Sequence, residues 1–363
     1  MRSFTQTVIG ESNEKVEMGL PVTASENGRI RGMNGDVKMQ ELSMGFECAA
    51  ILLIGFNRPE RLAAQVERLR QVRPSRLFIA VDGPRKDRPE DVDAVRRSRD
   101  AAKLVDWPCE LSIRFLDENH GCRFAPPEAI SWMFESVDAG IILEDDCVPT
   151  IEFLLYASEL LDRYRDESRV GMISGNNFYG FQTDKTASYH FSRHVHIWGW
   201  ATWRRAWQFY DGSMGRYQNT LRELLDSPAP NKYERYRNKY LQSVIQNPTT
   251  WDLQWFVALT ANELLSVVPR INLVSNVGHE KGALHTGGFV FDLPHFCANE
   301  GFDDSLSHPK SVLCDEAADA RHANRFAGYV PRILTIVGAW PGMMPLMRLL
   351  WKIEKSVPVL FRV

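Results

Sequence analysis

The strongest constraint on the fold of this chain is a regular alternation between short apolar runs and helical stretches, which extends from Cys48 to about residue 174. Each apolar run has the length of a strand, about four to eight residues, and a segment with helical periodicity separates it from the next. Strands that alternate with helices in this way indicate βαβ units, which build a mostly parallel sheet with helices on both faces. We therefore expect an α/β fold with a Rossmann-like sheet.

The expected strands are residues 49–56, 76–82, 110–116, 139–146 and 170–174, and the expected helices are 59–69, 89–105, 126–137 and 150–164. After about residue 188 the pattern changes to a strand-like SYHFSRHVHIW, a tryptophan-rich WGWATWRRAW, two basic amphipathic helices and a helix at WDLQW. We expect this second half to form the other wall of a ligand cleft at the carboxyl ends of the strands, where α/β sheets bind their ligands.

These patterns divide the chain into three regions. Residues 1–45 are polar and lack periodicity, so we expect an N-terminal extension with little core. Residues 46–290 form the expected catalytic domain, and residues 291–363 form a C-terminal extension. In that extension, the apolar stretch from Ile333 to Met347 is shorter than the roughly 20 residues of a spanning helix. Basic residues follow it, which suits peripheral binding to an anionic membrane surface as well as a tail docked on the domain.

The composition argues against two classes of protein. The chain has 43 Lys and Arg against 46 Asp and Glu, a net charge of −3, and so lacks the basic excess of a nucleic-acid-binding protein. The six cysteines form no C-x-x-C pair, so we expect reduced core residues rather than a zinc site. Because no apolar run of the length of a secretion signal opens the chain, we expect a cytoplasmic location.

The sharpest chemical signal is the acidic triplet Glu144, Asp145 and Asp146, which follows an apolar strand. Three neighbouring carboxylates repel one another unless a cation or hydrogen-bond donors compensate them. Hard oxygen ligands of this kind favour Mg²⁺ or Mn²⁺. The alternative is that the acids stabilise the start of the helix that opens near Pro149.

Two further loops follow neighbouring strands, and we expect them at the same edge of the sheet. Asn57 and Arg58 follow the first strand, and Asp82 follows the second. A carboxylate there can accept a hydrogen bond from a nucleobase, while Arg58 can neutralise a phosphate or stack on the base. For Asp82 the alternative is a turn-forming role before Gly83 and Pro84.

Seven segments taken in order resemble the GT-A glycosyltransferases: LLIGFNRPERL, VDGP, NHGC, GIILEDDCVPT, ISGNNF, HIWGWATWRRAW and WDLQW. The resemblance spans about Cys48 to Thr286 and is closest to bacterial family 2-like transferases, with a fainter likeness to the N-acetylglucosaminyltransferase that begins complex N-glycans. It implies a GT-A fold, a nucleotide-sugar donor that is most often a UDP-sugar, and a divalent metal.

The resemblance also implies roles for the acids and for Arg58. Asp82 matches the residue that contacts the uracil, and Arg58 matches a basic residue near the nucleotide. Asp145 would face the ribose or an ordered water shell, and Asp146 would ligate the metal. Glu144 departs from a strict D-x-D motif but fits an E-D-D variant.

Four more positions follow from the resemblance, each with a simpler alternative. Arg123 would lie near the donor or be a surface arginine. His285 would ligate the metal, favouring Mn²⁺, or be a polar loop residue. Gly199 and Trp200 would line the donor-sugar pocket, with the indole packed on the sugar ring, whereas we expect Trp203 and Trp207 in a core stripe at helical spacing.

Asp252 is the expected general base, because related enzymes place an acid in a comparable W-D segment facing the acceptor; the alternative is a role in helix capping. His194 and His196 are two residues apart and would share one face of an expected strand. For these histidines we favour packing or acceptor contacts over a zinc site. The sequence thus indicates a metal-dependent, inverting transferase that moves a sugar from a nucleotide donor to a glycan or lipid-linked acceptor.

Two other functions stay open. A sugar-1-phosphate nucleotidyltransferase has a similar sheet but needs a Gly-rich basic loop after the first strand, which GFNRPERL lacks. A non-catalytic carbohydrate-binding protein on a degenerate fold would not need its acids, and all of them are present.

Overall fold

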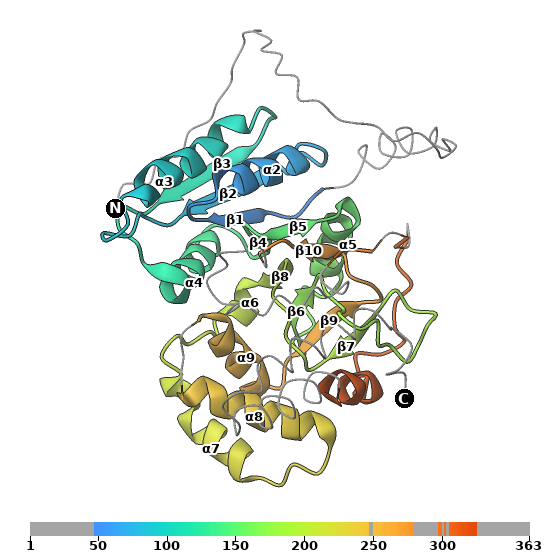
Figure 1. Cartoon of the computed structure of the whole chain (residues 1–363). Coiled ribbons are helices and arrows are strands. Elements are labelled where there is room, and N and C mark those ends of the chain that lie inside the picture. The colour runs from blue at the N-terminus through green and yellow to red at the C-terminus, as the bar shows by residue number, and fades with distance from the viewer. Residues whose placement is uncertain (1–46, 247–249, 279–296, 300, 303–304, 325–363) are drawn as a thin grey trace, which may run out of the picture.

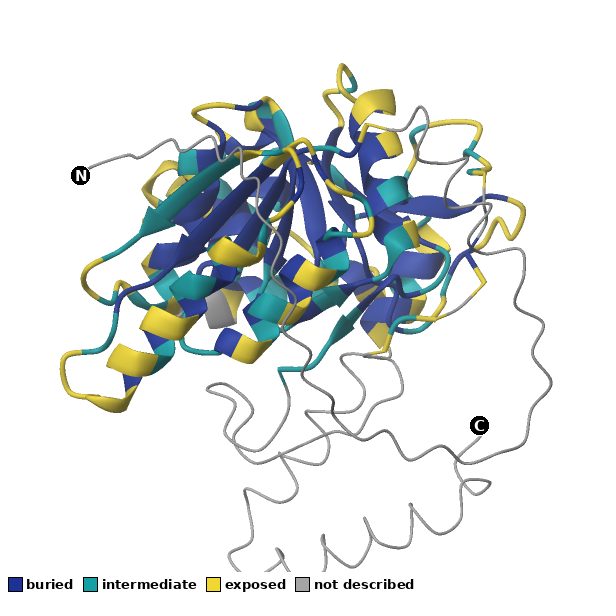
Figure 2. Ribbon diagram, turned by 90° about the horizontal axis from the view of Figure 1, so that it is seen from above, coloured by how far each residue is buried: buried dark blue, intermediate teal, exposed yellow. Residues whose placement is uncertain are grey.

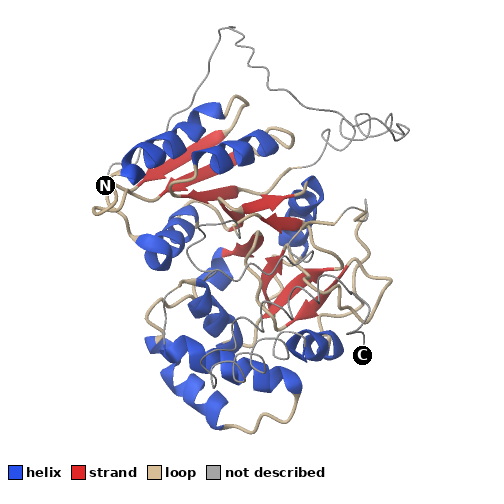
Figure 3. Ribbon diagram, viewed as in Figure 1, coloured by secondary structure: helices blue, strands red, loops and turns tan. Residues whose placement is uncertain are grey.

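The computed structural model describes residues 47–246, 250–278, 297–299, 301–302 and 305–324. The first half alternates strictly between strand and helix, as Figures 1 and 3 show. Its elements are β1 (Ile51–Gly55), α2 (Pro59–Leu69), β2 (Arg76–Val81), α3 (Glu90–Asp100), η1 (Ala101–Leu104), β3 (Glu110–Phe115), α4 (Gly121–Met133) and β4 (Ala139–Glu144).

The second half is less regular and adds short strands and a group of helices. Its elements are β5 (Cys147–Pro149), α5 (Ile151–Arg163), β6 (Val170–Ser174), β7 (Tyr189–Ser192), β8 (Trp200–Trp203), α6 (Arg204–Trp207), η2 (Gly215–Tyr217), α7 (Gln218–Asp226), α8 (Lys232–Gln246), α9 (Asp252–Ala261), β9 (Leu265–Pro269) and β10 (Val274–Asn276). Residues 316–324 form a further helical segment.

The main sheet has eight strands in the order β3-β2-β1-β4-β8-β6-β9-β7, and β5 pairs with β10 in a separate ribbon. The pairs β2·β3, β1·β2, β1·β4 and β6·β9 are parallel. The pairs β4·β8, β6·β8 and β7·β9 are antiparallel. The prediction of an α/β fold is therefore confirmed, and the parallel part lies mainly in its first half.

Helices cover both faces of the sheet, because residues along each buried strand alternate between two cores. In β1, Ile51 and Leu53 face a core with α2, α3 and α5, whereas Leu52 and Ile54 face a second core with α4 and the α6–α9 group. Figure 2 shows the strands as a buried layer between these helices. Such continuous apolar strands are typical of a sheet that is covered on both sides.

The connections change face between β1 and β4. Helices α2 and α3 pack on one face of the sheet, and α4, which leads into β4, packs on the other. The strand order reverses at this point, with β2 on one side of β1 and β4 on the other. Open α/β sheets bind ligands in the crevice outside the carboxyl ends of the strands at such a switch point.

Several element boundaries differ from the sequence predictions. Helix α4 begins at Gly121 and contains Pro126, where we expected its start. Strand β7 ends at Ser192, so His194 and His196 lie in the connection that follows rather than on a strand face. The tryptophans do not share one helical stripe, because residues 200–203 are a strand and only residues 204–207 are helical.

The expected boundary near residue 290 does not end the packed unit. Phe302 belongs to the core on the α5 face, and the Ser192 hydroxyl donates to the Asp319 carboxylate at 2.6 Å. The N-terminal extension and the stretch from Ile333 to Met347 lie outside the described residues. In the described part of the chain, no helix has the length and apolar character needed to cross a bilayer.

Candidate functional site at the ends of β1 and β4

The acidic triplet lies at the switch point of the sheet. Glu144 is the last residue of β4, and Asp145 and Asp146 form the turn that leads into Cys147 and β5. The backbone N–H of Val277 donates to the Asp146 carbonyl at 2.9 Å and ties the turn to the segment after β10. The carboxylates are thus held on a short, well-packed turn rather than on a long loop.

Arg58, which follows β1, provides the cation that faces this turn. Its Nη1 lies 2.7 Å from Asp145 Oδ1 and 3.4 Å from Asp146 Oδ2. Burial lowers the pKa of the Arg58 guanidinium, but the charges of Asp145 and Asp146 outweigh that effect, and the pKa is raised overall. Arg58 was expected to meet a phosphate or a base, and in this structure its guanidinium binds the protein's own acids.

The two aspartates of the turn differ in how much of their bonding capacity is used. Asp145, with 11% of its side chain exposed, makes the short bond to Arg58 and also accepts from the backbone of Phe56. It is therefore directed at the protein rather than at a ribose or a water shell. Asp146 is 22% exposed, and its carboxylate contacts only Arg58 at 3.4 Å and the Cys147 thiol at 3.5 Å among the described residues.

Glu144 lies in a buried and acidic environment. Burial, together with the charges of Asp146, Asp145 and Asp252, raises the pKa of Glu144 to about 8. The Trp251 indole acts in the opposite direction as a hydrogen-bond donor to the carboxyl group. Several acidic side chains are therefore near one another at this edge of the sheet, and Arg58 binds two of them.

Asp252 reaches the same site from α9. It raises the pKa values of Glu144 and of Tyr210, in both cases after the larger effect of burial. The half-buried Asp252 side chain has no hydrogen bond or ion pair with any residue that the structure describes. Trp251 occupies the N-cap position of α9 without a side-chain cap bond, so the capping alternative has no support in this geometry.

Asp82 is buried, with 8% of its surface exposed, and its carboxylate accepts four hydrogen bonds. Oδ1 accepts from the backbone N–H groups of Gly83 at 2.8 Å and His120 at 2.9 Å. Oδ2 accepts from Asn119 Nδ2 and the backbone N–H of Gly121, both at 2.9 Å. Four donors fill the usual capacity of a carboxylate, so these oxygens hold the turn after β2 to the start of α4. They also explain why α4 begins at Gly121.

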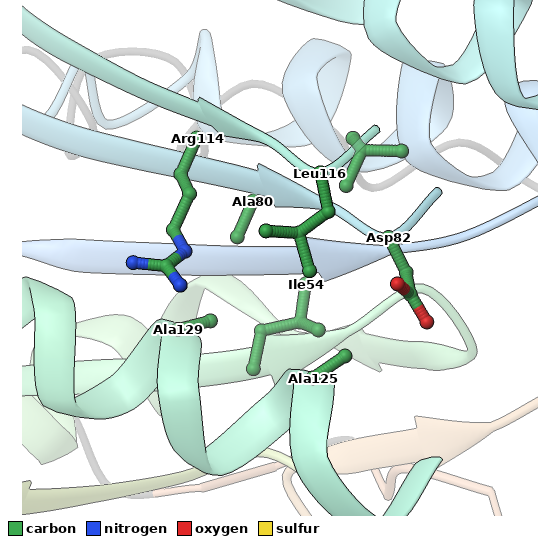
Figure 4. A pocket seen from close by; sticks show the side chains of 9 residues that line it. Ile54, Ala80, Asp82, Arg114, Leu116, Ala125 and Ala129 are labelled. Atoms are coloured by element: carbon green, nitrogen blue, oxygen red, sulfur yellow. The ribbon is translucent and has the colours of Figure 1, made fainter. Parts of the chain in front are cut away.

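A small pocket lies beside Asp82, between the sheet and α4 (Figure 4). Its lining includes Ile54 and Ala80 from the sheet and Ala125 from α4, with Asp82 and Arg114 as the charged groups. Its volume of about 10 Å³ is that of a single water molecule.

Asn57 and Arg123 have different surroundings. Asn57 turns away from the acidic turn and donates from Nδ2 to Asp91 Oδ1 at 2.8 Å. Arg123 is half-buried at the start of α4, and its guanidinium lies 5.3 Å from the centre of the Phe124 ring. Its buried Nε has no hydrogen-bond partner among the described residues, so Arg123 retains donor capacity near the site.

The expectation that Trp200 stacks on a sugar is wrong for this structure. Its side chain is fully buried, and its ring packs against Trp251 and Trp255 at centroid distances of 5.8 and 5.7 Å. Gly199 has a φ of +66°, and a Cβ there would lie 2.7 Å from Val274. The glycine is therefore required for packing against β10, whatever its relation to a ligand.

The histidine predictions have separate outcomes. His194 is buried, and its ring lies close to those of His196 and His322, with centroid distances of 6.1 and 4.0 Å. His194 Nε2 also lies 3.1 Å from the Asp319 carbonyl. These contacts agree with the packing part of the expectation for His194 and His196, and the part on acceptor contacts stays a prediction. His285 lies outside the described residues.

The sequence analysis missed three residues that shape the acidic turn. The Gln65 amide binds the backbone on both sides of the two aspartates, and Trp251 binds Glu144. Gly278 passes so close to Asp146 that a Cβ there would lie 2.3 Å from Oδ2. Only Gln65 left a visible signal, as a polar residue on the apolar face of its helix.

No three His, Cys, Asp or Glu side chains in the described part of the chain form a ready metal-ligand set. A divalent cation at this turn would take one or two carboxylates from the protein and its other ligands from water or phosphate, which is common for Mg²⁺ and Mn²⁺. Of the two aspartates of the turn, Asp146 fits that role better, because its contacts with Arg58 and Cys147 are longer than the bond between Asp145 and Arg58.

A scan against protein-family models finds no match to this chain, and a search of curated proteins finds no similar one.

Proposed function

We propose that this chain is a metal-dependent glycosyltransferase of the GT-A type, which transfers a sugar from a nucleotide-diphosphate sugar to a hydroxyl of a glycan or lipid-linked acceptor. The observation that carries the proposal is the location of an acidic turn, bound by one arginine, at the switch point of an α/β sheet, with Asp252 near it and without a hydrogen bond or ion pair to any described residue. This edge is where sheets of this kind bind nucleotides.

The acidic turn supplies the metal-binding part of the site. Asp146 would hold Mn²⁺ or Mg²⁺, with Glu144 beside it, and the bound ion would neutralise the charge that develops on the leaving diphosphate. Arg58 holds Asp145 in place at 2.7 Å, and 30% of its side chain is exposed. Arg58 would also carry positive charge toward a donor phosphate that approaches the turn.

Asp252 would serve as the general base. In an inverting transfer, the acceptor oxygen bonds to the anomeric carbon while the bond from that carbon to the diphosphate breaks, and the hydroxyl proton passes to the Asp252 carboxylate. A carboxylate with no partner among the described residues is free to accept that proton. Arg123, which is half-buried, would contact the donor from the start of α4.

A nucleobase would lie near Asp82, the residue that the resemblance relates to the uracil. The pocket beside Asp82 in Figure 4 has room for about one water molecule in this structure, so the base would lie outside it. Because the Asp82 oxygens already accept four hydrogen bonds, Asp82 would support the pocket wall, and a direct contact with the base would require one of these bonds to be exchanged.

The proposal is tested by incubating the full chain with a panel of UDP-, GDP- and dTDP-sugars, with and without Mn²⁺, and measuring release of the nucleoside diphosphate. We expect slow release from one donor, which depends on Mn²⁺ and is lost in Asp146→Asn. An Asp138→Asn variant is a suitable control, because Asp138 is 91% exposed at the opposite end of β4. Absence of release from every donor with every acceptor preparation would contradict the proposal.

A second incubation distinguishes the alternative enzyme. A nucleotidyltransferase would release pyrophosphate from UTP and a sugar 1-phosphate, and a glycosyltransferase would not.

The basic C-terminal tail motivates a hypothesis for the acceptor, namely a membrane-bound glycan precursor at the inner face of the cell membrane. Addition of membrane lipid extract should then stimulate transfer.

A further inference from the structure

Gln65 is a buried polar residue on an otherwise apolar helix face. It lies on α2 beside Leu62, Val66 and Leu69, which are fully buried, and only 3% of its own surface is exposed. Its Nε2 donates to the Glu144 carbonyl at 2.6 Å and to the Cys147 carbonyl at 3.0 Å. These two carbonyls lie at the two ends of the turn that presents Asp145 and Asp146.

The orientation of this amide follows from its partners. Both neighbours are carbonyl oxygens, which only accept hydrogen bonds, so the amide nitrogen with its two hydrogens must face them. The opposite orientation would place three oxygens together. A single carboxamide therefore joins the first and the fourth residue of the turn.

The glutamine satisfies two backbone carbonyls and leaves one of its own atoms unsatisfied. Its Oε1 is buried and has no hydrogen-bond partner among the described residues, and an unsatisfied buried acceptor is costly. A leucine or methionine would avoid that cost but would leave the Glu144 and Cys147 carbonyls without the donor that Gln65 supplies. Gln65 thus departs from the apolar face of its helix in order to bind the acidic turn, and such departures are expected mainly at functional sites.

Helix α2 therefore binds the acidic turn at two positions along its length. Arg58, at the N-cap of α2, binds the carboxylates of Asp145 and Asp146. Gln65, two helical turns later on the same face, binds the backbone on either side of them. The helix can thus fix both the charges and the backbone of the turn.

We propose that Gln65 is a positioning residue that fixes the turn from Glu144 to Cys147 so that the Asp146 carboxylate is presented to a divalent cation. This inference rests on the proposed function. Outer-shell partners of metal ligands typically change metal affinity by about 10–100-fold when they are removed, and Gln65 holds the backbone of the proposed ligand rather than its side chain. We expect an effect near the lower end of that range.

The test compares two buried glutamines that are each replaced by methionine. Gln65→Met removes both hydrogen bonds and keeps the volume of the side chain. Gln254→Met is the matched control, because Gln254 is 1% exposed and neither of its amide atoms has a hydrogen-bond partner in the described part of the chain. Both proteins are studied as the full chain, and circular dichroism melting establishes that each is folded.

Two measurements report on the positioning of the turn. Hydrogen exchange followed by mass spectrometry gives the protection of the peptide that covers residues 144–147 in the ligand-free protein. Titration followed by the electron paramagnetic resonance signal of free Mn²⁺ gives the affinity for Mn²⁺ alone and with a nucleotide sugar. We expect Gln65→Met to exchange faster in this peptide and to bind Mn²⁺ about tenfold more weakly, with Gln254→Met like the wild type in both.

The outcomes separate this inference from the proposed function. If the wild type binds Mn²⁺ and turns over a donor while Gln65→Met has the wild-type Mn²⁺ affinity, the positioning role is wrong and the proposed function stands. If both methionine variants lose affinity to the same extent, general loosening of the core explains the result and the inference is also wrong. If the wild type neither binds Mn²⁺ nor releases nucleotide, the proposed function fails and the role of Gln65 fails with it.

Discussion

The guanidinium of Arg58 and the carboxylate of Asp145 form a 2.7 Å ion pair that joins the end of β1 to the turn after β4. The two residues are far apart in the chain and meet because β1 and β4 are neighbouring parallel strands. Since the switch point lies between these strands, the ion pair spans the crevice in which ligands of such sheets bind. The ion pair therefore contributes both to the stability of the fold and to the geometry of the site.

Removing one partner of this pair should destabilise the protein. We expect Asp145→Asn to lower the free energy of unfolding by about 1–3 kcal/mol, because it leaves a partly buried guanidinium without its closest anion. Urea denaturation at pH 7 measures the effect. Asp100→Asn, which removes one member of a surface cluster with Arg96 and Lys103, should change stability much less, because exposed ion pairs contribute little. Equal effects of the two variants would show that the Arg58 pair is not structurally important.

Asp82 allows a direct choice between a structural role and a base-reading role. We expect Asp82→Ala to destabilise the protein by about 2–4 kcal/mol, because it leaves the backbone N–H groups of Gly83, His120 and Gly121 without their acceptor. Thermal melting measures this effect in the absence of any ligand. A variant that melts like the wild type and differs only in donor KM would contradict the structural role and favour direct contact with the nucleobase.

Asp252 should be required for turnover but not for folding. With no bond to the described residues, its replacement by Asn is expected to leave the melting temperature unchanged. The kcat should fall by roughly 10²–10⁴-fold, the usual contribution of a general base, and donor KM should change little. A kcat within about threefold of the wild type would mean that another group accepts the proton.

The buried histidines predict a loss of stability at acid pH. Burial lowers the pKa of His190 to about 4 and, with His194 and His190 nearby, that of His196 to about 3. Because an unfolded histidine has a pKa of about 6.5, the unfolded chain binds more protons between these values, so stability falls as the pH drops below about 6.5. Each such histidine accounts for about 2 kcal/mol between pH 7.5 and pH 5.

Urea denaturation at the two pH values measures this loss. His196→Phe, which keeps an aromatic ring against Phe178 at 4.6 Å, should reduce the difference between the two pH values. His120→Gln, at a more exposed ring with 41% of its side chain accessible, serves as the control. Identical pH dependence in the His196 variant and the wild type would contradict this account.

Local pattern predicted much of the first half of the fold. Helix α2 has the expected bounds of 59–69, and β2 differs from its prediction by one residue, because apolar periodicity and strand length are visible within a short window. The start of α4 was missed since its position depends on Asp82, which lies far before it in the sequence. A local rule that places Pro126 near a helix start could not include that contact.

Only part of the candidate site could be predicted from the sequence, for the same reason. The triplet from Glu144 to Asp146 is contiguous, so its charge is evident without a structure. The partners Gln65 and Trp251 come from distant segments, and their amide and indole groups have no signature of their own. For Trp200 the residue type alone was ambiguous, because an indole can stack on a sugar ring or pack in a core. Its contacts with Trp251 and Trp255 place it in the core.

The most direct test of the central claim is the binding of Mn²⁺ in the presence of a nucleotide sugar, followed by electron paramagnetic resonance for the wild type and for Asp146→Asn. The account predicts one tightly bound Mn²⁺ per wild-type chain and a loss of that binding in Asp146→Asn, with both proteins melting at similar temperatures. Equal Mn²⁺ binding by the two proteins, or none by the wild type with any donor, would contradict the claim that this acidic turn is the metal-binding part of a glycosyltransferase site.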